Sequence, residues 1–248
     1  MTVLLLCDAG DLSARWIERG LQHRRVPVLH VTGTDLVSAD RFGHSIGRDG
    51  PRLRIRLRDG RSFTYPSVAG VINRLTYLPE PGDARVPASD REYAATELNA
   101  ITLSWMSALA ATVPFVDRPS PGWIGGEWRS PAEWALLVHA AGLVAAPIAL
   151  PSLPNASQPS PSAAEAVTFG LIVADRAWVS GARTGHDRQG LREGLVRLAR
   201  LAEADTLGVG LDPQGRVIRV NQVPDVRPTG EAGLSRLAEL VGYGGVDA

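Results

Sequence analysis

Two segments near the end of the chain decide the fold: Gly208-Val209-Gly210-Leu211, and Val217-Ile218-Arg219-Val220-Asn221-Gln222-Val223-Pro224. Between them lies Asp212-Pro213-Gln214-Gly215, a run of turn-forming residues. The pattern predicts a hairpin that runs from residue 206 to residue 223. An amphipathic helix with inward-facing Leu195 and Leu198 is expected before it, over residues 191–203.

The composition is that of a globular protein without a strong charge. Of the 248 residues, 44% are hydrophobic and 21% are charged, and the formal net charge is zero. A neutral chain argues against nucleic acid as the main partner, and no segment approaches the roughly 20 apolar residues of a membrane span. The single Cys7 cannot form an intramolecular disulfide and fits a reducing compartment, so we expect a cytoplasmic protein with no membrane partner.

All 26 basic residues are arginine, because the chain contains no lysine. A GC-rich genome explains such a replacement without any functional cause. Whatever its origin, it excludes reactions that require a lysine nucleophile, a Schiff base or a phosphate-loop lysine. Arginine can bind phosphate, but it cannot act as a titratable base at neutral pH.

The start of the chain has the pattern of a parallel sheet covered by helices. A strand is predicted over residues 3–6, a helix over residues 12–23, and a second strand over residues 27–31. A third strand, over residues 68–72, is expected in the same sheet. The predicted fold class is therefore α/β, with an N-terminal parallel-sheet domain.

Arginines alternate with apolar residues in a second predicted hairpin, over residues 52–65. A three-residue loop, Arg58-Asp59-Gly60, gathers the apolar side chains on one face by pairing Ile55 with Phe63 and Leu53 with Tyr65. The other face then carries Arg54 and Arg56. That row is either a solvated surface or a surface that meets an acidic partner, and it makes both arginines candidates for a partner surface.

Two helix starts carry capping-box patterns, Ser89-Asp90-Arg91-Glu92 and Ser130-Pro131-Ala132-Glu133. Three tryptophans, Trp123, Trp128 and Trp134, lie around the second start. Packing of a loop against the helix accounts for them. The alternative is an aromatic surface for a peptide or protein partner, with Trp123 and Trp128 as its candidates.

A segment rich in proline and serine, residues 151–164, predicts a linker. We therefore divide the chain into residues 1–150, a linker over residues 151–166, and residues 167–248. None of the five histidines has the spacing of a metal site with a cysteine or another histidine, so no metal site is predicted. His186 fits an exposed loop, and Cys7, in a predicted strand, is expected to be buried and inert.

The order of several landmarks resembles that of ATP-grasp proteins, especially those of peptide-tailoring pathways. The landmarks are Asn73-Arg74, Glu92-Tyr93 with Trp105, Asp117-Arg118-Pro119, the helix over residues 130–142, and the Gly-Val strand followed by Asn221 and Pro224. This resemblance covers most of the chain. It implies a pre-ATP-grasp-like domain followed by a reduced ATP-grasp-like α+β domain.

The chain departs from that family at the positions that carry its chemistry. The resemblance implies an aspartate at Gly210 and a glutamate at Arg219, so two metal-ligand positions are lost and only Asn221 remains. The family's lid subdomain, which supplies lysines, is replaced by the short segment over residues 151–166. We therefore expect that neither ATP nor magnesium binds in the family's manner.

These departures favour a catalytically degenerate protein, a pseudoenzyme that binds an enzyme or peptide of the same biosynthetic pathway, or a second copy of itself. The alternative is an active enzyme that reuses the cleft between the two halves, such as a carboxylate–amine ligase or a transferase with an anionic substrate. Its binding candidates are Asn73, Arg74, Arg118, Arg219 and Asn221. We also expect Arg219 to form a structural ion pair with Asp212 or Asp225.

Overall fold

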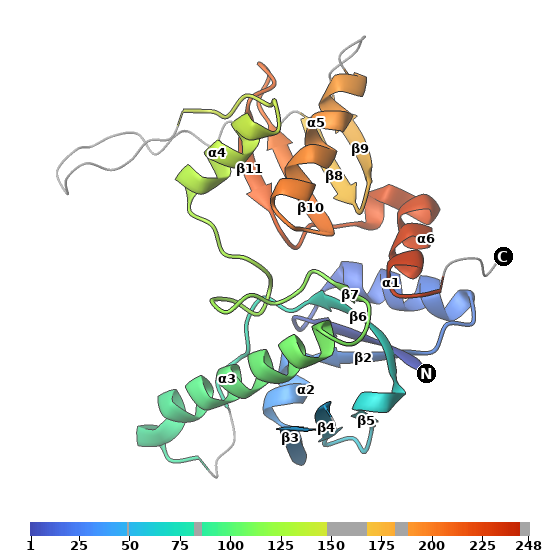
Figure 1. Cartoon of the computed structure of the whole chain (residues 1–248), viewed down its shortest axis with the longest axis vertical. Helices are drawn as coiled ribbons and strands as arrows, with labels where there is room; N and C mark the ends of the chain where they lie inside the picture. The colour runs from blue at the N-terminus through green and yellow to red at the C-terminus, as the bar shows by residue number, and fades with distance from the viewer. Residues whose placement is uncertain (49, 82–85, 148–167, 182–187, 244–248) are drawn as a thin grey trace. The chain divides into compact units, whose positions relative to one another are not determined.

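The computed structural model describes residues 1–48, 50–81, 86–147, 168–181 and 188–243 (Figure 1). Contacts group the chain into two units, Met1–Trp128 with Asp225–Ala248, and Arg129–Pro224. This grouping differs from the predicted division at residue 150, because the last helix belongs to the first unit and residues 129–147 belong to the second. The predicted linker over residues 151–166, like His186, lies outside the described residues.

The first unit is built on a parallel sheet with the strand order β2-β1-β6-β7 (Figure 1). Its central strands are nearly unbroken apolar runs, as expected for strands buried on both faces. The prediction that residues 3–6, 27–31 and 68–72 share one parallel sheet is confirmed. The bounds are β1 Thr2–Cys7, β2 Val28–Thr32, β6 Val68–Arg74 and β7 Phe115–Val116.

The last helix, α6 (Gly230–Leu240), packs against the first, α1 (Leu12–His23). The two helices are in close contact at Gly20, which has no side chain: a Cβ atom added there would lie only 2.2 Å from Leu234 Cδ2. The side chain of Leu234 is buried there. This apolar contact explains why the C-terminal segment joins the first unit, contrary to its predicted place in the second.

A three-stranded antiparallel sheet extends the first unit, with the order β3-β4-β5. Its strands are β3 Arg41–Gly47, β4 Gly50–Arg56 and β5 Ser62–Thr64. The predicted loop is confirmed: Ile55 pairs with Phe63, and Gly60 has a φ of +88°. The predicted pair of Leu53 with Tyr65 is wrong, because the chain turns into a 3-10 helix at Tyr65–Ser67. Strand β3 was not predicted from the sequence.

The long helix α3 (Arg91–Ala110) covers the apolar face of this sheet. Trp105 is fully buried there, with its ring 6.4 Å from that of Phe42 and 6.1 Å from that of Phe63. The capping box predicted at the start of α3 is wrong. A 3-10 turn, Ala88–Asp90, precedes the helix. The N-cap residue of α3 is Asp90, and its side chain makes no capping hydrogen bond. A short helix, α2 (Gly33–Val37), follows β2.

The second unit is an antiparallel sheet with the order β11-β10-β8-β9 and two helices. Helix α4 begins at the predicted capping box, in which Ser130 and Glu133 satisfy each other's backbone N–H groups. The sheet packs closely on α5, since a Cβ atom at Gly170 would lie 2.5 Å from Leu195 Cδ1. The bounds are α4 Pro131–Ala140, β8 Thr168–Val173, β9 Arg176–Gly181, α5 Arg188–Leu201, β10 Thr206–Leu211 and β11 Val217–Asn221.

None of the helices in the described part of the chain combines the length and the apolar character that a membrane crossing requires.

Candidate functional site

The predicted closing hairpin is formed by β10 and β11. Strand β10 is buried along its whole length between β8 and β11, and β11 is an edge strand. Gly210 on β10 pairs directly with Arg219 on β11, whose side chain is exposed. The two positions at which the resemblance implies metal ligands are therefore cross-strand neighbours, one without a side chain and one with a cation.

The donor set of this hairpin does not fit a magnesium ion. Asn221 is exposed, and its Oδ1 already accepts a hydrogen bond of 3.1 Å from the Val223 N–H. Magnesium in proteins is held by oxygen ligands, usually with at least one carboxylate. Among the described residues of the whole chain, no group of three or more histidine, cysteine, aspartate or glutamate side chains could hold a metal ion.

The nearest carboxylate of the hairpin, Asp212, is engaged with Arg216. The Asp212 side chain accepts bonds from the Arg216 backbone N–H at 2.8 Å and from its Nε at 2.7 Å. Burial acts to raise the pKa of this carboxyl, but the two hydrogen bonds outweigh burial and lower it. Arg219 forms no ion pair with another described residue, so its predicted pairing with Asp212 or Asp225 is wrong: Arg216 pairs with the first carboxylate and Arg227 with the second.

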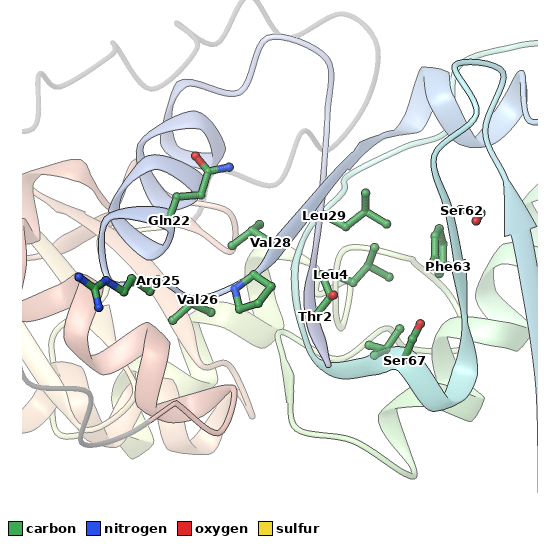
Figure 2. A pocket seen from close by; sticks show the side chains of 12 residues that line it. Thr2, Leu4, Gln22, Arg25, Val26, Val28, Leu29, Ser62, Phe63 and Ser67 are labelled. Atoms are coloured by element: carbon green, nitrogen blue, oxygen red, sulfur yellow. The ribbon is translucent and has the colours of Figure 1, made fainter.

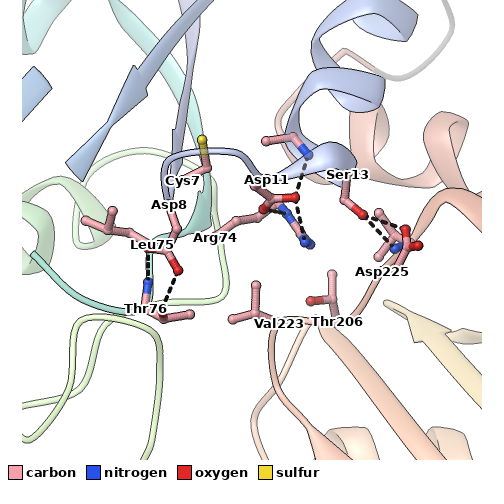
Figure 3. A network of polar contacts seen from close by, with 12 residues as sticks. Cys7, Asp8, Asp11, Ser13, Arg74, Leu75, Thr76, Thr206, Val223 and Asp225 are labelled. Atoms are coloured by element: carbon pink, nitrogen blue, oxygen red, sulfur yellow. Dashed lines mark hydrogen bonds and ion pairs between the residues drawn. The ribbon is translucent and has the colours of Figure 1, made fainter. Parts of the chain in front are cut away.

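A polar network lies in the first unit, at the carboxyl ends of β1 and β6 (Figure 3). After β1 the chain crosses to β2 on one side and later returns to β6 on the other. Ligands of open α/β sheets usually bind at such a switch point. Here Asp11 both caps α1, by accepting from the Ala14 N–H at 3.0 Å, and binds Arg74 Nε at 2.7 Å. Asp8 accepts bonds from the Thr76 backbone N–H and hydroxyl.

The network extends to the C-terminal segment through Asp225. Ser13 donates a hydrogen bond of 2.7 Å to Asp225, and Arg227 Nη2 lies 2.7 Å from the other carboxylate oxygen. These side-chain bonds, opposed by burial, hold the pKa of Asp225 well below its ordinary value. The charges in this network therefore have partners within the protein, and the network binds the C-terminal segment to α1.

The predicted binding residues of the first unit have structural roles. Asn73 is buried, and its Nδ2 donates to the backbone oxygens of Asp117, at 3.0 Å, and Ile124, at 2.7 Å. It thereby fixes the loop over residues 117–124, on which Arg118 is exposed. Asn73 and Arg74 are adjacent and buried, whereas Arg219 and Asn221 belong to the other unit.

The two tryptophans predicted for a partner surface differ in their environment. Trp123 Nε1 donates a hydrogen bond of 2.7 Å to the Thr76 backbone oxygen, and the ring packs against the core of the first unit. Trp128 is 65% exposed. The third tryptophan of the cluster, Trp134, stacks under the Arg129 guanidinium at 5.5 Å.

A thiol–imidazole–carboxylate series in the first unit was not predicted from the sequence. Cys7 Sγ lies 2.9 Å from His30 Nε2, and His30 Nδ1 lies 2.8 Å from Glu18 Oε2. The order resembles a nucleophile, a base and an orienting acid. However, Cys7 is only 1% exposed, and burial, reinforced by the charge of Asp11, raises the pKa of its thiol to about 12. The thiol is therefore neutral and covered, as the strand position of Cys7 predicted, and it is no nucleophile.

A cavity of about 560 Å³ opens at the other end of β1 (Figure 2). Leu4, Val28, Leu29 and Phe63 line it, and Arg25 is its one charged lining residue. Acid–base chemistry requires a group that titrates near neutral pH. The lining contains no such group, so this cavity is not a candidate active site.

Comparisons with known proteins establish the fold. Neither a family model nor a curated protein matches the sequence. The macrocyclase MdnB from Microcystis aeruginosa MRC matches with a TM-score of 0.65 and 11% identity, over 98% of this chain and 100% of that one. MdnC of the same organism, solved with its precursor peptide MdnA, matches with a TM-score of 0.68 and 12% identity, over 97% and 99%.

A third solved structure agrees with these two. It is the Chryseobacterium gregarium RiPP-associated ATP-grasp ligase, in complex with ADP and a leader and core peptide. Its TM-score is 0.66 at 9% identity, over 97% of this chain and 95% of that one. Identities this low support a statement about the fold and not about the activity. The chain has the mixed α/β fold of the peptide-tailoring ATP-grasp ligases.

Proposed function

We propose that this chain is a non-enzymatic binding protein, which keeps the fold of an ATP-grasp ligase and serves as an accessory partner in peptide modification. The observation that carries this proposal is the cross-strand pair of Gly210 and Arg219. The resemblance implies carboxylates at both positions. The pair supplies no oxygen ligand and adds a positive charge.

The charge of Arg219 disfavours a metal ion at this hairpin. At about 4 Å and an effective dielectric constant near 20, two unit charges repel by about 4 kcal/mol, and a dication doubles that figure. Solvent screens an exposed guanidinium, so the real repulsion is smaller. The missing ligands remain the stronger argument. The absence of lysine from the whole sequence also disfavours nucleotide binding, because lysine is a usual point-charge ligand of phosphate groups.

The proposed partner is a peptide or a protein of the same pathway. The structural neighbours support this choice, since MdnC was solved with a precursor peptide and the Chryseobacterium enzyme with a leader and core peptide. A second copy of the chain is the other partner that we consider. An enzyme that reuses the old cleft is less favoured, because Asn73 and Arg74 are buried and bonded within their own unit.

Calorimetric titration with ATP and magnesium tests the proposal. We expect no magnesium-dependent heat at micromolar nucleotide. The ligase PsnB, solved with AMPPNP and a precursor peptide, serves as the positive control under the same conditions. Micromolar, magnesium-dependent binding to this chain would overturn the proposal. Sedimentation of the protein alone decides whether a second copy is the partner.

A further inference from the structure

The outer face of the β3-β4-β5 sheet carries a cluster of arginines. The strand register places Arg41 beside Arg56, Gly43 beside Arg54, and Ser45 beside Arg52. All four arginines are exposed, whereas Leu53, Ile55 and Phe63 on the opposite face are buried. We call the surface formed by Arg41, Arg52, Arg54 and Arg56 the arginine face.

The charges on this face lack compensation from the sheet itself. Strands β3, β4 and β5 contain no aspartate or glutamate. Within the described part of the chain, Arg41, Arg54 and Arg56 have no ion pair, although Arg41 and Arg56 are directly opposite each other. Like charges at such a position destabilise a sheet. Folding of this sheet requires only a polar outer face, so its own packing does not explain four arginines.

Other arginines of the protein are placed differently. Arg61, Arg74, Arg216 and Arg227 each lie within ion-pair distance of a carboxylate in their own unit. The abundance of arginine in this lysine-free chain therefore does not by itself explain why Arg41, Arg54 and Arg56 lack an ion pair with a described residue. The charges of Arg41, Arg54 and Arg56 have no ion-pair partner among the described residues, so a complement to these three must come from elsewhere.

The geometry of the face matches an extended acidic peptide. Alternate residues of a strand are spaced by about 6.7 Å, and an extended peptide has the same repeat, so acidic side chains at every second position can meet Arg52, Arg54 and Arg56. Gly43 has no side chain, so it does not cover the neighbouring Arg54, which is exposed. Guanidinium groups bind carboxylates through two parallel hydrogen bonds.

Nucleic acid is a poorer match for this face. Proteins that bind single strands combine positive charge with aromatic side chains on which bases stack. Here Phe42 and Phe63 alternate to the opposite face and contact Trp105. We propose that the arginine face binds an acidic segment of a peptide or protein in an extended conformation. This inference rests on the proposed function as a binding partner, and it names the chemistry of that partner.

Fluorescence anisotropy with a labelled peptide tests the inference. The probe is a peptide of alternating glutamate and threonine, and its control has glutamine in place of glutamate. We expect the acidic peptide alone to bind. The double variant Arg54→Glu, Arg56→Glu should weaken binding at least tenfold. The control variant Arg15→Glu, Arg192→Glu changes the net charge equally at exposed sites on α1 and α5, and it should weaken binding less than twofold.

The neutral double variant Arg54→Gln, Arg56→Gln keeps the test decisive if the glutamate variant fails to fold, because it should still weaken binding several-fold. Equal losses in the test and control variants, or no binding of the acidic peptide, would overturn the inference. An oligothymidylate of equal charge that binds more tightly than the peptide would overturn the choice of a peptide.

The test is independent of the proposal on enzymatic activity. A silent titration with magnesium and ATP, together with no peptide binding, refutes the arginine face as a docking surface and leaves the non-enzymatic proposal standing. Nucleotide binding together with binding of the acidic peptide refutes the non-enzymatic proposal and leaves the arginine face standing as a docking surface.

Discussion

Arg74 and Arg56 show two opposite uses of arginine within one folding unit. Arg74, at the end of β6, is 5% exposed and is held by Asp11, which also caps α1. Arg56, at the end of β4, is exposed and lies opposite another arginine. The first is part of a network that fixes backbone segments in place. The second has no ion pair with a described residue.

The difference indicates where a function should be sought. The carboxyl end of a parallel sheet is the usual place for a ligand, but there the charged side chains of the polar network already have hydrogen-bond partners within the protein. At the β3-β4-β5 sheet the charge is exposed and uniform in sign. If the first region is structural and the second is available to a partner, substitutions in the first should lower stability and substitutions in the second should weaken binding.

The largest effect is expected from Arg74→Ala. Removal of the guanidinium leaves the Asp11 carboxylate, whose side chain is 12% exposed, without its partner. Breaking a buried ion pair in this way costs about 3–5 kcal/mol of the free energy of unfolding. Urea unfolding measures the loss. Arg118→Ala, which removes an exposed guanidinium nearby in the same unit, should change stability by less than about 0.5 kcal/mol. A loss below about 1 kcal/mol for Arg74→Ala would show that the network is not structural.

The buried thiol should make stability fall at alkaline pH. The pKa of Cys7 is about 12 in the folded protein, compared with about 8.5 in an unfolded chain. Between these values the unfolded state loses its proton first, so stability decreases as pH rises above about 8.5. From pH 8 to pH 10 the loss attributable to Cys7 is about 2 kcal/mol. It is measured as the difference between wild type and Cys7→Ala, and parallel pH profiles would contradict the buried, neutral thiol.

Much of the fold could be predicted because local pattern and tertiary structure agree in it. The apolar runs of β1, β2 and β6 specify a buried parallel sheet, and the parity of Leu53, Ile55 and Phe63 specifies the hairpin register. Strand β3 was missed because Gly43, Ser45 and Gly47 are poor strand formers. Only its pairing with β4 makes this segment a strand.

The candidate site was predicted less well, for a physical reason. The sequence identifies Asn73, Arg74 and Arg219 as polar residues at strand ends or in strands. It does not tell which group each one meets: Arg74 binds Asp11, which is 63 positions away, and Asn73 binds backbone oxygens of the loop over residues 117–124. Asp212 pairs with Arg216 and not with the predicted partner Arg219, because the turn between β10 and β11 brings Arg216 to this carboxylate. The Cys7–His30–Glu18 series joins three separate elements and has no local signal.

A small stabilisation is expected from Arg41→Glu. The new carboxylate lies opposite Arg56, so it replaces a repulsive cross-strand pair with an attractive one. Such pairs contribute about 0.2–1 kcal/mol, and the thermal midpoint should rise. Binding of the acidic peptide should weaken in the same variant. Arg41→Lys keeps the like charges together and should leave the midpoint unchanged. A lower midpoint for Arg41→Glu would mean that Arg41 supports the sheet and is not held for a partner.

The smallest effect is expected from Arg219→Glu, which distinguishes a structural from a non-structural role for the altered hairpin. Arg219 is exposed on an edge strand, faces a glycine, and has no ion pair with a described residue. Substitutions at such positions change the free energy of unfolding by less than about 0.5 kcal/mol. Arg216→Ala is the matched comparison, because it leaves the Asp212 carboxylate, 2% exposed, without its ion-pair partner. It should cost about 1–3 kcal/mol. If thermal denaturation instead shows a larger loss for Arg219→Glu than for Arg216→Ala, then Arg219 supports the fold. In that case the arginine at the position where the resemblance implies a glutamate is explained by stability, and it no longer supports the loss of a reaction.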